Sequence, residues 1–178
     1  YVEVKVDTDT FYEVDPDTYE AIITVEYEDA PAVGELVIEK KGEVLDAYKG
    51  GLFADSEDKE FVYKEGSLAG AKFEIYAAED IYTADMQTDE NGNRNKYYAE
   101  GDLVATVVTG EDGKAKVSDL PLGKYRVVEV EAPYGFVLNS EEQYVTFVYV
   151  DDKTPVIKES LTFANDRQKV DLSVAKLD

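Results

Sequence analysis

Residues 123–136 read GKYRVVEVEAPYGF, a run of strand-forming residues that ends in a turn signal. Valine and tyrosine favour the pleated backbone of a β-strand, and the Ala-Pro-Tyr-Gly that follows favours a turn. Successive side chains of a strand point to opposite faces, so Tyr125, Val127 and Glu129 share one face. If that face is buried, a carboxylate lies among apolar side chains, which is costly unless the acid is neutral or has a chemical role.

Two further runs, LVIEK and LTFAN, also place a polar residue after two apolar residues on the same face. The apolar residues of the three faces are Leu36 and Ile38, Tyr125 and Val127, and Leu161 and Phe163. The polar residues that follow them are Lys40, Glu129 and Asn165. An amine and a carboxamide that meet beside an acid can form an amide bond with loss of ammonia. The pattern therefore predicts a Lys40–Asn165 cross-link in this apolar core, with Glu129 as the catalytic proton shuttle.

Burial among these six apolar residues disfavours the charged forms of both the amine and the acid, which leaves the amine free to attack. A purely structural alternative also fits the pattern: Lys40 extends to solvent or pairs with Glu129, and Asn165 satisfies a local turn. The neighbouring Lys41 and Glu131 lie on the wrong side of the alternation or past the strand end. They could take these roles only if a β-bulge shifted the register.

Several motifs occur together in the same order as in a known family. They are LAGAKFEIY at 68–76, LPLGKY at 120–125, APYGF at 132–136 after Glu129, and TFAN at 162–165. Over residues 35–170 the chain resembles the CnaB-type modules of Gram-positive surface adhesins and pilins, which are also called SpaA-like or prealbumin-like. The resemblance implies an all-β fold, an antiparallel β-sandwich of Greek-key type. It also implies a self-formed isopeptide bond, whose roles fall by position on Lys40, Asn165 and Glu129.

The composition excludes several kinds of chemistry. The 178 residues include no cysteine and no histidine, which removes disulfides, thiolate or imidazole metal ligation and histidine-based catalysis. We predict no metal site and no cofactor. With 18 basic and 40 acidic residues the net charge is −22, which disfavours binding to nucleic acid or to anionic membranes. No apolar run is long enough to insert across a membrane.

The chain suggests one main domain with partial neighbours. We expect a strand-rich segment at 1–33, a β-sandwich at 34–170 and the start of a following module at 171–178. The first segment is either the end of a preceding module or a pair of accessory strands, and residues 11–33 loosely repeat 136–156. Its alignment on the later strand places Lys5 where Glu129 would stand, so no cross-link is predicted for it.

At the other end of the chain, LSVAK at 172–176 repeats the pattern of LVIEK at 36–40. Lys176 would then be the reactive lysine of the following module.

Within the main domain, turn signals separate short strands. Strands are expected at 35–41, 60–64, 68–78, 103–109, 115–117, 143–150 and 155–165. Residues 42–58 are expected to form a polar connection, and 111–114 a hairpin turn.

Residues 79–102 form an acidic, polar insertion. Its centre spaces Asp89, Asn91 and Asn93 as in a calcium loop, but the glycine comes too early. The spacing therefore favours a turn, and calcium binding is left open.

These features predict a structural stalk module of a cell-wall-anchored, extracellular adhesin or pilus-like protein, whose anchor lies outside this chain. Its partners would be neighbouring modules of the same chain, with a host surface protein or glycan as a further candidate. Cross-linking is single-turnover, so the chain is not predicted to be an enzyme, and no carboxylate pair is singled out for hydrolysis. The alternative is a ligand-binding β-sandwich in which Tyr82, Tyr97 and Tyr98 of the insertion contact carbohydrate or a host protein.

Overall fold

The computed structural model describes residues 13–14, 17–18, 21–22, 30–50, 60–171 and 173–175. The chain divides into two compact units, Tyr1–Ala30 and Pro31–Asp178. In the first unit, β1 (Glu13–Val14) pairs antiparallel with β2 (Ala21–Ile22). The predictions for Lys5 and Lys176 lie outside the described residues, and the predicted domain boundaries stay a prediction.

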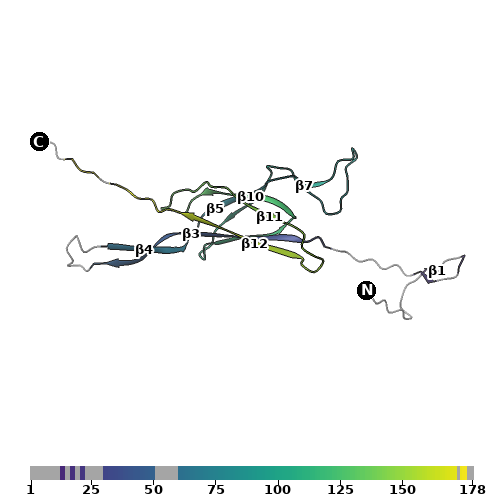
Figure 1. The fold of residues 1–178 in the computed structure, drawn as a ribbon, viewed down its shortest axis with the longest axis horizontal. Coiled ribbons are helices and arrows are strands. Elements are labelled where there is room, and N and C mark those ends of the chain that lie inside the picture. Colours follow the sequence, from purple (N-terminus) through teal and green to yellow (C-terminus); the bar gives the residue numbers. More distant parts are fainter. Residues whose placement is uncertain are drawn as a thin grey trace. The chain divides into compact units, whose positions relative to one another are not determined.

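In the second unit the described residues form ten strands and the loops between them (Figure 1). The strands are β3 (Val33–Lys49), β4 (Glu60–Ser67), β5 (Lys72–Ala77), β6 (Ile81–Tyr82), β7 (Lys96–Tyr98), β8 (Leu103–Val108), β9 (Lys114–Leu120), β10 (Gly123–Glu131), β11 (Gln143–Phe147) and β12 (Val156–Asn165). No helix in the described part of the chain is long and apolar enough to cross a membrane.

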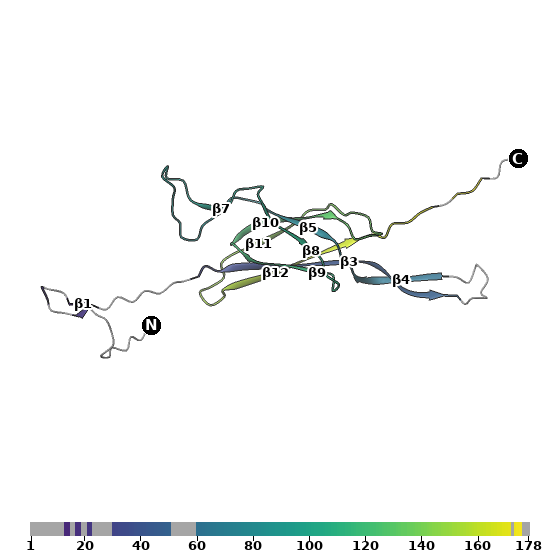
Figure 2. The same cartoon turned by 180° about the vertical axis from the view of Figure 1, so that it is seen from behind.

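Two sheets face each other in this unit (Figures 1 and 2). One sheet has the strand order β11-β10-β5-β8 and is antiparallel throughout. In the other, β3 pairs with β12 on one side, and with β9 and then β4 on the other side. The predicted antiparallel β-sandwich is confirmed, with one parallel pair in the second sheet.

The parallel pair joins the first and the last strand of the sandwich. In it, Val33 lies opposite Val156 and Gly42 lies opposite Asn165. Parallel neighbours need a long crossover, and here all the strands between β3 and β12 supply it. The chain therefore enters the sandwich at Val33 and leaves it at Asn165, at opposite ends of this strand pair.

The prediction that residues 42–58 are a connection was wrong for 42–49, and 51–58 lie outside the described residues. β3 continues to Lys49, and its second half forms an antiparallel ribbon with β4, in which the rings of Tyr48 and Phe61 lie 5.0 Å apart. Glycine and acidic residues weaken the strand signal there, but pairing with β4 satisfies the backbone hydrogen bonds.

The prediction that residues 111–114 close a hairpin was also wrong. The turn itself forms, with Gly113 N–H donating to the Gly110 carbonyl at 2.8 Å. However, β8 belongs to one sheet while β9 pairs with β3 in the other. The turn therefore carries the chain from the first sheet to the second. At the second sheet it is held by a hydrogen bond from Lys40 N–H on β3 to the Gly113 carbonyl at 2.7 Å.

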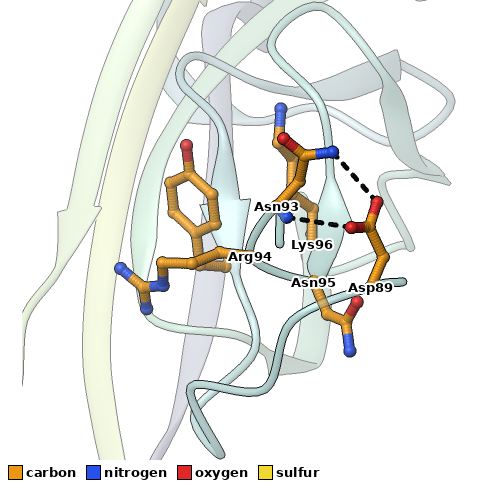
Figure 3. A pocket seen from close by; sticks show the side chains of 6 residues that line it. Asp89, Asn93, Arg94, Asn95 and Lys96 are labelled. Carbon is orange, nitrogen blue, oxygen red and sulfur yellow. Dashed lines mark hydrogen bonds between the residues drawn. The ribbon is translucent and has the colours of Figure 1, made fainter. Parts of the chain in front are cut away.

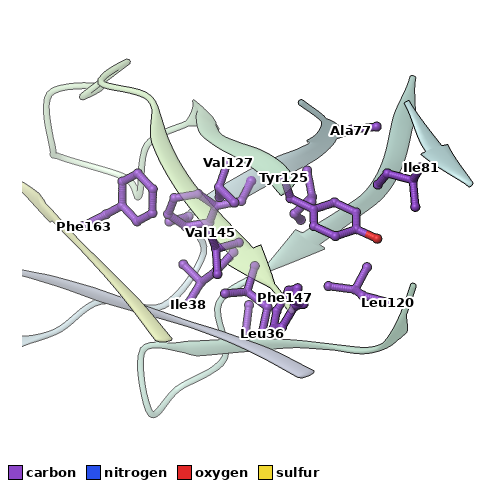
Figure 4. Close-up of a cluster of buried hydrophobic side chains, with 14 residues drawn as sticks. Leu36, Ile38, Ala77, Ile81, Leu120, Tyr125, Val127, Val145, Phe147 and Phe163 are labelled. Carbon is purple, nitrogen blue, oxygen red and sulfur yellow. The ribbon is translucent and has the colours of Figure 1, made fainter. Parts of the chain in front are cut away.

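The core fills the space between the two sheets (Figure 4). Leu36, Ile38, Tyr125, Val127 and Phe163 are buried, and Leu161 is partly buried against the same cluster. The backbone of β3 approaches β11 closely, since a Cβ added at Gly34 would come within 2.5 Å of the Phe147 ring. Glycine at this position therefore allows the two sheets to pack.

Candidate functional site

Three strands bring the predicted polar residues together at one end of this core. Lys40 lies on β3, Glu129 on β10 and Asn165 on β12, so the two facing sheets both contribute. The exposed fractions of these residues are 1%, 1% and 4%. Alternation along each strand places all three side chains on the inward face, next to apolar residues from the same strands.

The backbone at Lys40 is fixed where the pairing partner of β3 changes. Its N–H donates to the Gly113 carbonyl just before β9, and its carbonyl accepts from Leu68 N–H just after β4, at 2.9 Å. On the opposite side Lys40 lies across from Phe163 of β12. These contacts fix where the Lys40 side chain enters the core.

The three polar groups are in mutual contact. Lys40 Nζ donates to Asn165 Oδ1 at 2.6 Å, and Asn165 Nδ2 donates to Glu129 Oε1 at 2.9 Å. Lys40 Nζ also lies 3.2 Å from the same Glu129 Oε1. A single carboxylate oxygen therefore contacts both the amine and the amide nitrogen that a cross-linking reaction would release.

Two aromatic rings enclose the amine. The ring centroids of Phe73 and Phe163 each lie 5.9 Å from Lys40 Nζ, and the two rings are 4.8 Å apart. The sequence pattern identified Phe163 but not Phe73. Alternation along β5 does place Phe73 on an apolar face, but no signal in the sequence shows that this face lies opposite Lys40.

Burial lowers the pKa of the Lys40 amine, and the charge and hydrogen bond of Glu129 oppose this shift only in part. An amine attacks a carboxamide only in its neutral form, so desolvation makes the nucleophile available at lower pH. The arrangement thus combines a deprotonatable amine, an acid and a carboxamide in a buried site.

The lowered pKa predicts a pH dependence in an Asn165→Ala variant, which keeps the free amine. The unfolded amine binds its proton up to about pH 10.5, whereas the folded amine releases it at lower pH. In that window the unfolded state holds more protons, so the free energy of unfolding should rise as the pH rises.

Denaturant unfolding across pH 7 to 10 measures this slope. A Lys40→Met/Asn165→Ala variant is the reference that cancels tyrosine titration. Equal slopes in the two variants would contradict the prediction.

The neighbouring alternatives lie away from this site. The Lys41 side chain is 40% exposed and lies 3.9 Å from Glu65, and Glu131 is exposed. A register shift against β5 does occur between Glu129 and Glu131. Since it comes after Glu129, that residue stays on the core face.

The insertion at 79–102 folds into a small hairpin of β6 and β7. Asp89 accepts a hydrogen bond from the backbone N–H of Asn91 at 2.9 Å. It also accepts from the backbone N–H of Asn93 at 2.9 Å and from the Asn93 side chain at 3.1 Å (Figure 3). Its carboxylate thus closes a turn. Among the described residues no group of three or more acidic, histidine or cysteine side chains could hold a metal ion.

The same hairpin carries a surface recess beside Tyr82, over whose ring the Arg94 guanidinium lies at 4.5 Å. Tyr82 and Tyr97 are exposed. Tyr98, in contrast, is partly buried and packs against the core, so it is not the freely accessible ligand contact that the alternative function required. Ligand binding by the insertion stays a prediction.

The comparison with protein families agrees with a prealbumin-like sandwich. Residues 59–161 match the SpaA family, described as a prealbumin-like fold domain. The match spans more than half of the chain, which belongs to this family, and the resemblance seen in the motifs is confirmed. The matched range includes Glu129 but neither Lys40 nor Asn165.

Similar proteins come from Gram-positive bacteria. The trypsin-resistant surface T6 protein of Streptococcus pyogenes serotype M6 is 27% identical over 123 residues, which cover 68% of this chain and 21% of that protein. The chain thus spans about one fifth of that relative. Among solved structures, the minor pilin GBS52 of Streptococcus agalactiae is 19% identical with a TM-score of 0.46, covering 82% of this chain and 49% of the pilin. The major pilin SpaD of Corynebacterium diphtheriae is 20% identical with a TM-score of 0.43, covering 81% and 32%.

Proposed function

We propose that the sandwich is a structural stalk module of a Gram-positive surface protein, and that an amide bond between Lys40 and Asn165 locks it. Glu129 is the residue that assists bond formation. One observation supports this most strongly: amine, acid and carboxamide lie within 3.2 Å of one another in a buried site. If Lys40 and Glu129 formed only a structural ion pair, that pair would not need the Asn165 carboxamide, which hydrogen-bonds to both residues.

The reaction can proceed through Glu129 Oε1. The Lys40 ammonium passes a proton to this oxygen, and the neutral amine attacks the side-chain carbonyl carbon of Asn165, so that the carbonyl electron pair moves to Oδ1. The acid then protonates Nδ2, and the attacking nitrogen returns a proton to Glu129. When the carbonyl reforms, the C–N bond to Nδ2 breaks and ammonia leaves. An amide and a protonated Glu129 remain.

Proximity of the reactants and their burial accelerate formation of the amide bond. The fold holds both reactants in contact, which replaces a bimolecular encounter by an intramolecular step. Exclusion of water strengthens each interaction of the acid with the two nitrogens. Because the amide is the end product and the residues are consumed, the reaction occurs once per chain.

The test is the intact mass of the purified protein. The chain should weigh one ammonia molecule less than its sequence, and Glu129→Ala should have the full mass calculated for that variant. Glu131→Ala is the matched control, because it removes an exposed acid from the same strand and should leave the mass deficit in place. A wild-type chain at full sequence mass would contradict the proposal.

The stalk role extends to location and partners. We place the module outside the cell, in a cell-wall-anchored adhesin or pilus-like protein, with neighbouring modules of the same chain as its partners. Membership of the SpaA family and the similarity to a streptococcal surface protein support this. Thiol reductants cannot open an amide, so such a bond would serve where a chain without cysteine needs a permanent cross-link.

A further inference from the structure

A short segment after β10 covers the end of the core at which the three polar residues meet. Residues 135–139, called the strap here, run antiparallel to residues 164–168 at the end of β12. Gln168 N–H donates to the Gly135 carbonyl at 2.9 Å, and Val137 N–H donates to the Asp166 carbonyl at 2.8 Å. The strap therefore docks on the end of β12 that carries Asn165.

Asn139 links the strap to both partners of the site. Its backbone N–H donates to Glu129 Oε2 at 3.2 Å, and its side-chain Nδ2 donates to the Ala164 carbonyl at 3.2 Å. Its Oδ1 accepts from Glu141 N–H at 3.0 Å, which fixes the local turn. One residue thus contacts the acid and also the backbone directly before Asn165.

We propose that Asn139 is a positioning residue of the cross-linking site, an inference that rests on the proposed function. Its N–H holds Glu129 Oε2, so the carboxylate is fixed with Oε1 toward both nitrogens. Its side chain fastens the strap to β12. The acid is therefore held in its working orientation only when β12 has docked in register and brought Asn165 to Lys40.

Asn139 also lies between the acid and the molecular surface: it contacts Glu129 through its N–H and borders a surface recess. This recess of about 290 Å³ is also lined by Val137, Leu138, Ala164 and Asp166. The Glu129 side chain has no exposed surface. Loss of the Asn139 side chain should therefore loosen the orientation of the acid and admit water to it.

The experiment follows bond formation in the full chain. Chain recovered unfolded from inclusion bodies, and verified at full sequence mass, is refolded by dilution while intact mass measures the fraction that has lost ammonia. Asn139→Ala should slow the reaction roughly fivefold, the effect of one hydrogen bond, although the final product still forms. Circular dichroism verifies that each variant folds.

Gln143→Ala is the matched control. Gln143 Nε2 also donates to a β12 carbonyl, that of Thr162 at 2.8 Å, but none of its hydrogen bonds reaches Glu129. If both variants slow the reaction equally, Asn139 only helps β12 to dock, and the positioning role is wrong. Wild-type rate in Asn139→Ala overturns it as well. A wild-type chain that never loses ammonia overturns the proposed function, and this role with it.

The comparison of the two variants separates orientation of the acid from docking of β12. Each variant loses one side-chain hydrogen bond to a β12 carbonyl, but only Asn139 also contacts Glu129 through its backbone N–H, which alanine keeps. A slower reaction in Asn139→Ala than in Gln143→Ala therefore measures how firmly the side chain holds that N–H against the acid.

Discussion

Asn165→Ala is expected to lower the free energy of unfolding by about 5 kcal/mol, because it removes one partner of the proposed cross-link between residues 125 positions apart. Such a bond would restrict the unfolded chain far more than the folded one, in which Lys40 and Asn165 already touch. For a domain of this size the loss corresponds to a melting temperature lower by about 10–20 °C. Denaturant and thermal unfolding of the two proteins under identical conditions measure both quantities.

A double-mutant cycle separates the bond from the ordinary contacts of the asparagine. In a Glu129→Gln background the bond should not form, so adding Asn165→Ala should cost only the hydrogen bonds of the side chain, about 1–3 kcal/mol. The two substitutions should therefore be strongly non-additive. If Asn165→Ala costs the same with and without Glu129, the residue stabilises the fold by packing and hydrogen bonding alone.

Much of the architecture was predictable because strand alternation is a local property. The period of two along LVIEK, YRVVE and LTFAN gave the inward faces, and the structure buries Lys40, Glu129 and Asn165 there. Local pattern does not indicate which strands become neighbours. Strand β12 pairs parallel with β3, and β9 pairs antiparallel with β3 and not with β8. Both pairings depend on hydrogen bonds between segments that are distant in the sequence.

Prediction of the site from the sequence was limited in the same way, because local pattern does not show which distant residues meet. Lys40, Glu129 and Asn165 were proposed from the alternation and the family motifs, whereas Phe73 and Asn139 were missed. Phe73 contributes through the facing sheet, and Asn139 contributes a backbone N–H, a group that every residue except proline carries. Neither contribution leaves a residue type or spacing in the sequence that could point to it.

Pulling on the ends of the chain should extend the linked and unlinked proteins by very different lengths. Force enters through β3 and leaves through β12, which lie side by side and parallel and are loaded at opposite ends. With the bond in place, force passes from Lys40 directly to Asn165, and the residues between them carry no load. Without it, those 125 positions can be stretched, which adds about 430 Å of contour length.

Single-molecule force spectroscopy of the chain between two marker domains measures this difference. The wild type should show no unfolding step of that length at any force below bond rupture, whereas Glu129→Ala should show one per molecule. Glu131→Ala should behave as the wild type, because this exposed acid has no contact with the site. A long step in the wild type would mean that force reaches the whole sandwich. In that case the close contact of Lys40 with Asn165 would be a hydrogen bond and not a covalent link.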